Sequence, residues 1–217
     1  MAPRSIVAPE RRGRLIAIEG IDGCGKSTQT ALLAERIGAE ATFEPGATEL
    51  GASLRELLLQ RSARISARSE ALLMIADRAQ HVEEVVRPAL ERGMWVVTDR
   101  FSASTLAYQG TGRGLQPSVL KELIDWATSG LWPDLVVLLD VPTSLARERL
   151  RGSRADRLEL LGDGFQERVR RGFLAQAMNH PESWAVVDAA RPAEVVASEV
   201  ATIVQSRLGS LDADHRR

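Results

Sequence analysis

The stretch Leu15-Ile16-Ala17-Ile18-Glu19-Gly20-Ile21-Asp22-Gly23-Cys24-Gly25-Lys26-Ser27 decides the fold. Its first four residues form an apolar run of the length expected for a buried strand. Residues 20–27, called the P-loop below, match G-x-x-x-x-G-K-[ST], in which backbone N–H groups surround a phosphate. A helical pattern begins at Lys26, so the glycine-rich turn joins a strand to a helix, as such a loop requires.

Lys26 stands out because only two of the 28 basic residues are lysine. A compact ammonium fits inside a P-loop, whereas the wide planar guanidinium of arginine does not. The other lysine, Lys121, is not part of the N-K-x-D element with which GTPases read guanine. We therefore expect ATP with Mg²⁺ as the phosphate donor. The expected donor contacts are Gly20, Ile21, Asp22, Gly23, Cys24, Gly25, Lys26, Ser27 and Thr28.

The pattern along the chain predicts strands that alternate with helices. Apolar runs predict buried strands at residues 15–18, 95–97, 135–139 and 184–187, with a weaker one near 41–43. Helical patterns cover residues 26–37, 50–60, 69–92, 118–129, 144–150, 165–178 and 193–208. This order predicts an α/β fold of the P-loop NTPase type, in which helices cover both faces of a central five-stranded parallel sheet. Acidic residues follow four of the runs, at the sheet edge where ligands bind: Glu19, Asp99, Asp140 and Asp188.

The helical pattern over residues 69–92 has one broad apolar face. Its periodicity assigns Leu72 and Ala76 to that face and directs Arg78 elsewhere. Such a face can serve the core or a partner subunit, and the pattern does not separate these uses.

Composition limits the class of protein. A chain of 217 residues suits one domain, and a net charge of -1 gives no basic face for a nucleic acid. The single cysteine, Cys24, excludes an internal disulfide, and no run has the length of a signal peptide or membrane span. We expect a cytoplasmic protein whose disordered ends are residues 1–13 and 209–217, with one domain over residues 14–208.

Several arginines are candidates for binding the acceptor of the phosphoryl group. An acceptor that is itself a phosphate is ionised near pH 7, so its enzyme needs positioning and neutralisation of charge more than a general base. Arg100 follows Asp99 at a strand end, which suits that task. Five more arginines surround Gly152-Ser153, a candidate flexible lid at about residues 150–160: Arg147, Arg149, Arg151, Arg154 and Arg157.

Four further motifs resemble those of the thymidylate kinases, and the resemblance runs from residue 15 to about residue 204. They are Glu44-Pro45-Gly46, Asp77-Arg78-Ala79-Gln80-His81, the run Asp99-Arg100-Phe101-Ser102-Ala103-Ser104-Thr105-Leu106-Ala107-Tyr108-Gln109-Gly110, and Asp156-Arg157-Leu158-Glu159. The third is the most specific. Cys24 in the P-loop and the arginine-rich lid resemble the bacterial type of this family.

The resemblance implies a nucleoside monophosphate kinase that uses MgATP to convert dTMP to dTDP, and a homodimer without nucleic-acid or membrane partners. It implies that Arg100 holds the acceptor phosphate, that Asp99 and Ser27 organise Mg²⁺, and that Asp22 contacts the deoxyribose. The implied catalytic residues are Lys26, Asp99, Arg100, Arg154 and Arg157, with Arg149 and Arg151 near ATP. The implied acceptor contacts are Asp22, Glu44, Pro45, Met74, Arg78, Arg100, Ser104, Thr105, Tyr108 and Gln109, of which Arg78, Thr105 and Gln109 read the thymine edge.

Two departures keep alternatives open. Phe43 stands where many bacterial relatives have arginine, and Met74 stands where a phenylalanine often stacks on thymine. A kinase for another nucleoside monophosphate, or for a nucleoside with Glu44 as the base, is therefore a second hypothesis. A third is an ATP-binding switch or scaffold without efficient transfer.

Overall fold

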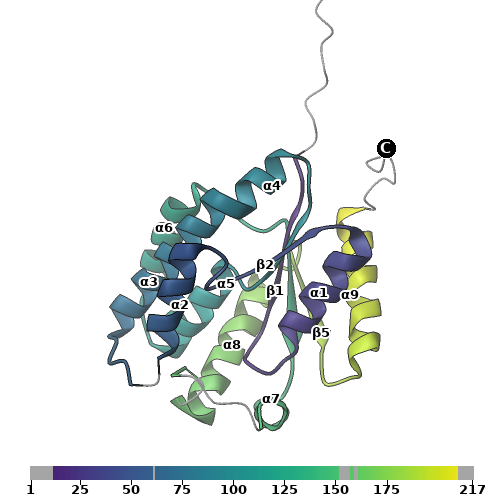
Figure 1. Cartoon of the computed structure of the whole chain (residues 1–217). Helices are drawn as coiled ribbons and strands as arrows, with labels where there is room; N and C mark the ends of the chain where they lie inside the picture. Colours follow the sequence, from purple (N-terminus) through teal and green to yellow (C-terminus); the bar gives the residue numbers. More distant parts are fainter. Residues whose placement is uncertain (1–11, 61, 152–156, 159–160, 210–217) are drawn as a thin grey trace, which may run out of the picture.

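The computed structural model describes residues 12–60, 62–151, 157–158 and 161–209 (Figure 1). Its five strands form one parallel sheet in the order β2-β3-β1-β4-β5. The strands are β1 (Leu15–Glu19), β2 (Glu40–Phe43), β3 (Val96–Asp99), β4 (Leu135–Asp140) and β5 (Trp184–Asp188). The predicted fold class is thereby confirmed.

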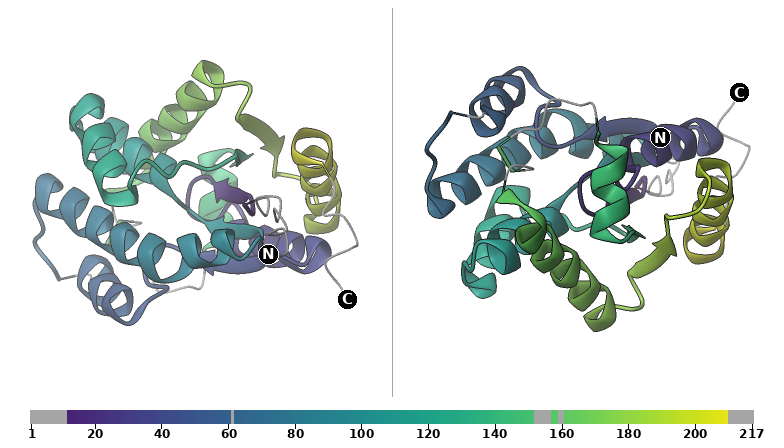
Figure 2. Two further views of the ribbon diagram at one scale, coloured as in Figure 1. Left: turned by 90° about the horizontal axis from the view of Figure 1, so that it is seen from above. Right: turned by 90° about the horizontal axis from the view of Figure 1, so that it is seen from below.

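Helices cover both faces of this sheet. On one face α1 (Lys26–Ile37) packs against α9 (Ala193–Leu208) (Figure 2). On the other face lie α3 (Ala67–His81), η1 (Val82–Val86), α4 (Arg87–Glu91), α5 (Ser102–Thr105), η2 (Leu106–Gly112) and α8 (Asp163–Asn179). Further out, α2 (Glu49–Leu59) and α6 (Pro117–Thr128) pack on α3, and α7 (Thr143–Arg149) precedes the lid region.

The core is the sheet and the inner faces of these helices. All five residues of β1 are buried, as are the first five of β4, because both faces of a central parallel strand are covered. The fold begins slightly earlier than expected, since the Gly13 N–H donates to the Leu90 carbonyl (2.9 Å). Apart from residues 12, 13 and 209, the expected terminal extensions lie outside the described residues.

The four predicted acidic residues lie at the ends of strands and belong to the strands themselves. Glu19, Asp99, Asp140 and Asp188 are the last residues of their strands, where the sequence predicted them just beyond. The register pairs Ile18 with Asp99, and the Arg100 N–H donates to the Ile18 carbonyl (3.0 Å). The turn after β3 is thereby held beside the P-loop.

The predicted helix over residues 69–92 is one helical segment with a wider turn at η1. Pro88 has no N–H for the carbonyl one turn earlier, which accounts for the interrupted hydrogen-bond ladder. Leu72 on the predicted apolar face is 55% exposed, so it does not serve the core, whereas the predicted direction of Arg78 is wrong because that residue is 3% exposed. Arg78 is buried because Glu44 and Thr105, from other elements, supply polar partners that periodicity does not reveal.

The sequence prediction missed the helical segment formed by α5 and η2. Residues 102–112 are rich in Gly, Ser and Thr, which favour helices weakly. Glu19 stabilises the start of α5 by accepting from the N–H groups of Phe101 (2.8 Å) and Ser104 (3.2 Å). Within the described ranges, none of the helices has the length and apolar character needed to cross a membrane.

Candidate active site

The P-loop forms the floor of the first pocket. Gly25 precedes α1 with φ of 99°, a conformation that favours glycine, and a Cβ there would meet no atom within 4 Å. At Gly23 a Cβ would lie 2.4 Å from the Ala146 carbonyl, so glycine lets α7 pack against the loop. The Lys26 Nζ lies 2.9 Å from the Ile21 carbonyl oxygen, which places the ammonium inside the curve. Exposed N–H groups, a helix N-terminus and one cation make an anion site.

Ser27 and Asp99 meet beside this loop. The Ser27 hydroxyl donates to Asp99 Oδ2 (2.5 Å), while the buried Asp99 Oδ1 has no hydrogen-bond partner. Mg²⁺ prefers such oxygen ligands and is commonly held by one or two of them together with substrate phosphates. No group of three or more His, Cys, Asp or Glu in the described ranges could hold a metal by itself. The residues therefore fit a Mg²⁺ ion that arrives with a polyphosphate.

Arg100 adopts a strained backbone conformation for a bulky residue, with φ of 72°. Its guanidinium donates to the Gly20 carbonyl (3.1 Å) and to Ser104 Oγ (2.9 Å), and it forms an ion pair with Asp22. It also stacks on the Tyr108 ring at 5.0 Å, and the Tyr108 hydroxyl donates to Asp22 (2.9 Å). The strained turn thus directs Arg100 back from β3 across the P-loop.

Asp22 is ionised in this setting. Burial raises the pKa of Asp22, but the charges of Arg100 and Lys26 outweigh burial and lower the pKa below its ordinary value. Burial also holds the pKa of Tyr108 well above its ordinary value, so its hydroxyl remains a donor.

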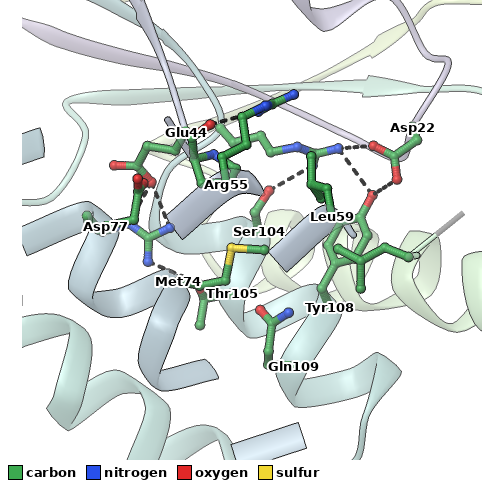
Figure 3. Close-up of a pocket in the computed structure, with 14 residues that line it drawn as sticks. Asp22, Glu44, Arg55, Leu59, Met74, Asp77, Ser104, Thr105, Tyr108 and Gln109 are labelled. Carbon is green, nitrogen blue, oxygen red and sulfur yellow. Dashed lines mark hydrogen bonds and ion pairs between the residues drawn. The ribbon is translucent and has the colours of Figure 1, made fainter. Parts of the chain in front are cut away.

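A second pocket lies on the other side of Arg100 (Figure 3). Ten residues predicted to bind the acceptor line it: Asp22, Glu44, Pro45, Met74, Arg78, Arg100, Ser104, Thr105, Tyr108 and Gln109. Four residues line both pockets, namely Asp22, Glu44, Arg55 and Arg100. The two pockets therefore adjoin, and Arg100 stands at their junction.

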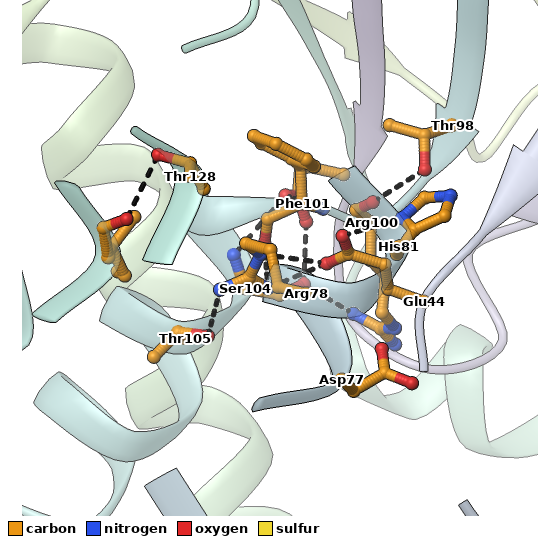
Figure 4. A network of polar contacts seen from close by, with 12 residues as sticks. Glu44, Asp77, Arg78, His81, Thr98, Arg100, Phe101, Ser104, Thr105 and Thr128 are labelled. Carbon is orange, nitrogen blue, oxygen red and sulfur yellow. Dashed lines mark hydrogen bonds and ion pairs between the residues drawn. The ribbon is translucent and has the colours of Figure 1, made fainter. Parts of the chain in front are cut away.

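A buried ionic network forms one wall of this second pocket (Figure 4). Arg78 pairs with Glu44 (2.8 Å) and donates to Thr105 Oγ1 and the Phe101 carbonyl (2.9 Å each). His81 Nδ1 lies 2.8 Å from the other Glu44 oxygen. Burial raises the pKa of Glu44, but Arg78 and His81 together lower it below its ordinary value. A carboxylate with both oxygens engaged is a poor general base near pH 7, which weighs against the nucleoside kinase hypothesis.

Arg55 is a pocket residue that the sequence interpretation missed. Its guanidinium stacks on the Phe43 ring at 5.8 Å and donates to the Pro45 carbonyl (2.7 Å). Arg55 thus brings a guanidinium from α2 to the side of the pockets where Phe43 lies. In the sequence, Arg55 is one polar residue among several on a predicted helix. Helical periodicity does not show which of these residues lines a pocket.

The lid arginines have separate positions. Arg149 lines the P-loop pocket and donates to the Ala189 carbonyl (2.9 Å), and Arg151 is exposed. Arg147 pairs with Asp163. Arg154 lies outside the described residues. Arg157 departs from its predicted catalytic place: it is buried, pairs with Glu70 (2.7 Å) and lines neither pocket.

Two other strand-end or loop charges are structural in this arrangement. Asp140, the last residue of β4, pairs with Arg170 (2.7 Å). Arg113 pairs with Glu70 (2.7 Å). The carboxylates of Asp140 and Glu70 thus have cationic partners, and these ion pairs lie outside the two pockets.

Glu19 makes stability depend on pH. Burial raises its pKa from the ordinary 4.5 to about 7, against smaller opposing effects of Ser104 and Arg100. Between these values the folded protein holds a proton that the unfolded chain has lost, so this stabilisation is complete below pH 4.5 and is lost as pH rises through about 7. We expect the unfolding free energy in urea to fall over that range less steeply in Glu19→Gln than in the unchanged protein. Equal slopes in both proteins would contradict the assignment.

Two pockets adjoin at the carboxyl edge of a parallel sheet. One contains the P-loop, and the Arg100 guanidinium lies where it meets the other. This arrangement defines a P-loop phosphotransferase of the nucleoside monophosphate kinase class. Comparison with known proteins narrows the class. A family model described as thymidylate kinase matches residues 18–200. The chain belongs to the thymidylate kinase family.

Individual relatives agree. The thymidylate kinase of Clavibacter michiganensis is 50% identical over 205 residues, which are 91% of this chain and 97% of that protein. That of Cupriavidus necator is 46% identical over 201 residues, which are 89% of this chain and 98% of that protein. The crystal structure of thymidylate kinase from Ehrlichia chaffeensis is similar with a TM-score of 0.75 and 32% identity, covering 89% of this chain and 99% of that one.

Proposed function

We infer that the protein transfers the terminal phosphoryl group of ATP to dTMP and releases ADP and dTDP. The observation that carries this function is the junction at Arg100, where a P-loop pocket and a second polar pocket share four residues. The family supports dTMP as the acceptor and gives no support to the two alternatives. The lysine in the P-loop and the absence of a guanine-reading N-K-x-D element in the sequence support ATP as the donor.

The donor side binds the polyphosphate through the P-loop. N–H groups of the loop and the Lys26 ammonium hold the β- and γ-phosphate oxygens. When bound, Mg²⁺ would lie against Ser27 and Asp99 and neutralise phosphate charge. Arg149 lines the same pocket and would contact the nucleotide beyond the loop.

On the acceptor side Arg100 would hold the phosphate of dTMP. An oxygen of that phosphate attacks the γ-phosphorus while the bond to the β-γ bridging oxygen breaks, and ADP leaves with the electron pair. The attacking oxygen is already anionic, so no side chain has to remove a proton. Asp22 and Tyr108, which fix the Arg100 guanidinium, would face the deoxyribose, and Arg78, Thr105 and Gln109 would face the thymine.

An acceptor panel tests this function. In an assay that couples ADP release to a colour change, we expect rapid turnover with dTMP, less with dUMP, and least with dCMP and thymidine. Thymidine lacks the phosphate that Arg100 holds, so its rate separates the kinase of a monophosphate from that of a nucleoside. Faster turnover with thymidine than with dTMP would contradict the assignment, and so would ATP hydrolysis that no monophosphate accelerates.

We further propose a homodimer. Leu57 on α2 and Leu72 on α3 are both about half exposed although these helices pack together. Exposed apolar side chains on adjacent helices are typical of subunit contacts. Sedimentation equilibrium would give the mass of two chains.

A further inference from the structure

Glu70 is a buried carboxylate that no part of the proposed mechanism uses. It lies in the first turn of α3, and its residue is 0% exposed. Gln109 Nε2 donates to Oε1 (2.9 Å), and Arg113 Nη2 and Arg157 Nη1 each donate to Oε2 (2.7 Å). A fully buried carboxylate with three different partners is costly to place, so its contacts call for a physical reason.

The ionisation of Glu70 determines what it can offer. Burial raises the pKa of Glu70, but hydrogen bonds from Arg113, Gln109 and Arg157 together lower it below the ordinary value. Near pH 7 the group is therefore a carboxylate, which accepts hydrogen bonds and donates none.

That restriction sets the orientation of the Gln109 amide. An amide presents two N–H donors on one side and a carbonyl acceptor on the other, and its partners decide which side faces where. Because Glu70 only accepts, the amino group of Gln109 must face it, and the carbonyl Oε1 faces away. Gln109 lines the acceptor pocket, and its amide end points toward Met74 in Figure 3. Among the described residues, none donates a hydrogen bond to this carbonyl.

A fixed acceptor at this place distinguishes pyrimidines. Thymine and uracil carry a hydrogen on ring atom N3 and can donate to Oε1. Cytosine has an unprotonated N3, so its lone pair would face the Gln109 carbonyl with no hydrogen between them. A site that leaves buried polar groups unpaired with the wrong ligand rejects that ligand strongly.

We propose that Glu70 is a positioning residue that sets base selectivity: it locks the Gln109 amide with its carbonyl toward the base, so that the pocket takes pyrimidines with an N3 hydrogen and rejects cytosine. This role rests on the proposed function, because it places the pyrimidine in the pocket that Gln109 lines. Arg113 and Arg157 compensate the buried charge, which keeps the carboxylate ionised and the lock in one orientation.

The test replaces the acceptor-only group by one that can also donate. In Glu70→Gln, the new amide can donate to Gln109 Oε1, which lets the Gln109 amide turn its amino group toward the pocket. We expect the ratio of kcat/KM for dTMP to that for dCMP to fall at least about tenfold, on the scale of one lost discriminating hydrogen bond. The ratio for dTMP to dUMP should stay the same, because both bases carry the N3 hydrogen.

Two further variants separate this effect from damage to the fold. Arg113→Lys keeps a cation beside Glu70, so the carboxylate stays ionised and the dTMP to dCMP ratio should match the unchanged protein. The double variant Glu70→Gln with Arg113→Gln removes one charge of each sign, which leaves the net charge of the network unchanged if Glu70→Gln alone does not fold. Circular dichroism and Tm establish that each protein is folded.

The possible results are distinct. A lower dTMP to dCMP ratio in the folded Glu70 variants, with an unchanged dTMP to dUMP ratio, supports the lock. A proportional loss with all three acceptors means that Glu70 only supports the fold, which overturns the proposal. The rate of the unchanged protein with dTMP tests the proposed function by itself, so the two failures are read from different numbers.

Discussion

Replacing Lys26 by alanine is expected to lower kcat about a thousandfold while leaving the protein folded. A loss of this size is the upper end of the range for one preorganised group that stabilises transition-state charge. The ammonium lies inside the P-loop, 2.9 Å from the Ile21 carbonyl oxygen, where it reaches the oxygens on which charge develops. Its long side chain is buried, but the loop conformation rests on glycines and on main-chain hydrogen bonds. Steady-state rates with saturating ATP and dTMP, and circular dichroism for the fold, measure both parts of this expectation.

Lys26→Arg is the matched control. It keeps the charge but adds a planar fork that is too wide for the loop, so we expect little recovery of kcat. Near-normal turnover in folded Lys26→Ala would show that the Lys26 ammonium has no part in phosphoryl transfer.

Arg100→Ala is expected to lower kcat about a hundredfold to a thousandfold and to raise the KM for dTMP. The guanidinium would bind the acceptor phosphate before transfer and stabilise charge during it, so both constants change. Its removal also leaves Asp22 without its ionic partner beside the incoming phosphate. Titration of dTMP at saturating ATP separates the two effects.

Arg170→Ala is the control for a lost arginine in general. Arg170 also pairs with a carboxylate, Asp140, yet it lines neither pocket. We expect its kcat and KM to stay within about threefold of the unchanged protein, because this partly buried ion pair lies outside both pockets. A comparable loss in both variants would show that Arg100 acts through stability.

The parts of the site that follow one another in sequence were predictable. The P-loop is a contiguous pattern with one mechanical meaning, and the strands around it are buried on both faces, so their apolar runs are unbroken. Asp99 and Arg100 were predictable because they directly follow a strand. Whether each side chain has its expected role stays a prediction.

Side chains whose meaning depends on distant partners were not predictable. Glu70 reads as an exposed charge on a helix, yet Gln109 and Arg157 converge on it from other elements. The sequence places Arg157 among the lid arginines, because its partner Glu70 is distant in the chain. Its burial against Glu70 follows only from the folded arrangement. Arg55 and Glu19 likewise acquire their roles from contacts that no local pattern encodes.

The junction at Arg100 is tested most directly by a crystal structure with thymidine and adenosine joined through five phosphates. We expect the adenosine half over the P-loop, the thymine against Gln109, and the Arg100 guanidinium in contact with the phosphate next to thymidine. A thymidine half outside the second pocket, or an Arg100 that touches no phosphate, would contradict the placement of donor and acceptor on which the proposed transfer depends.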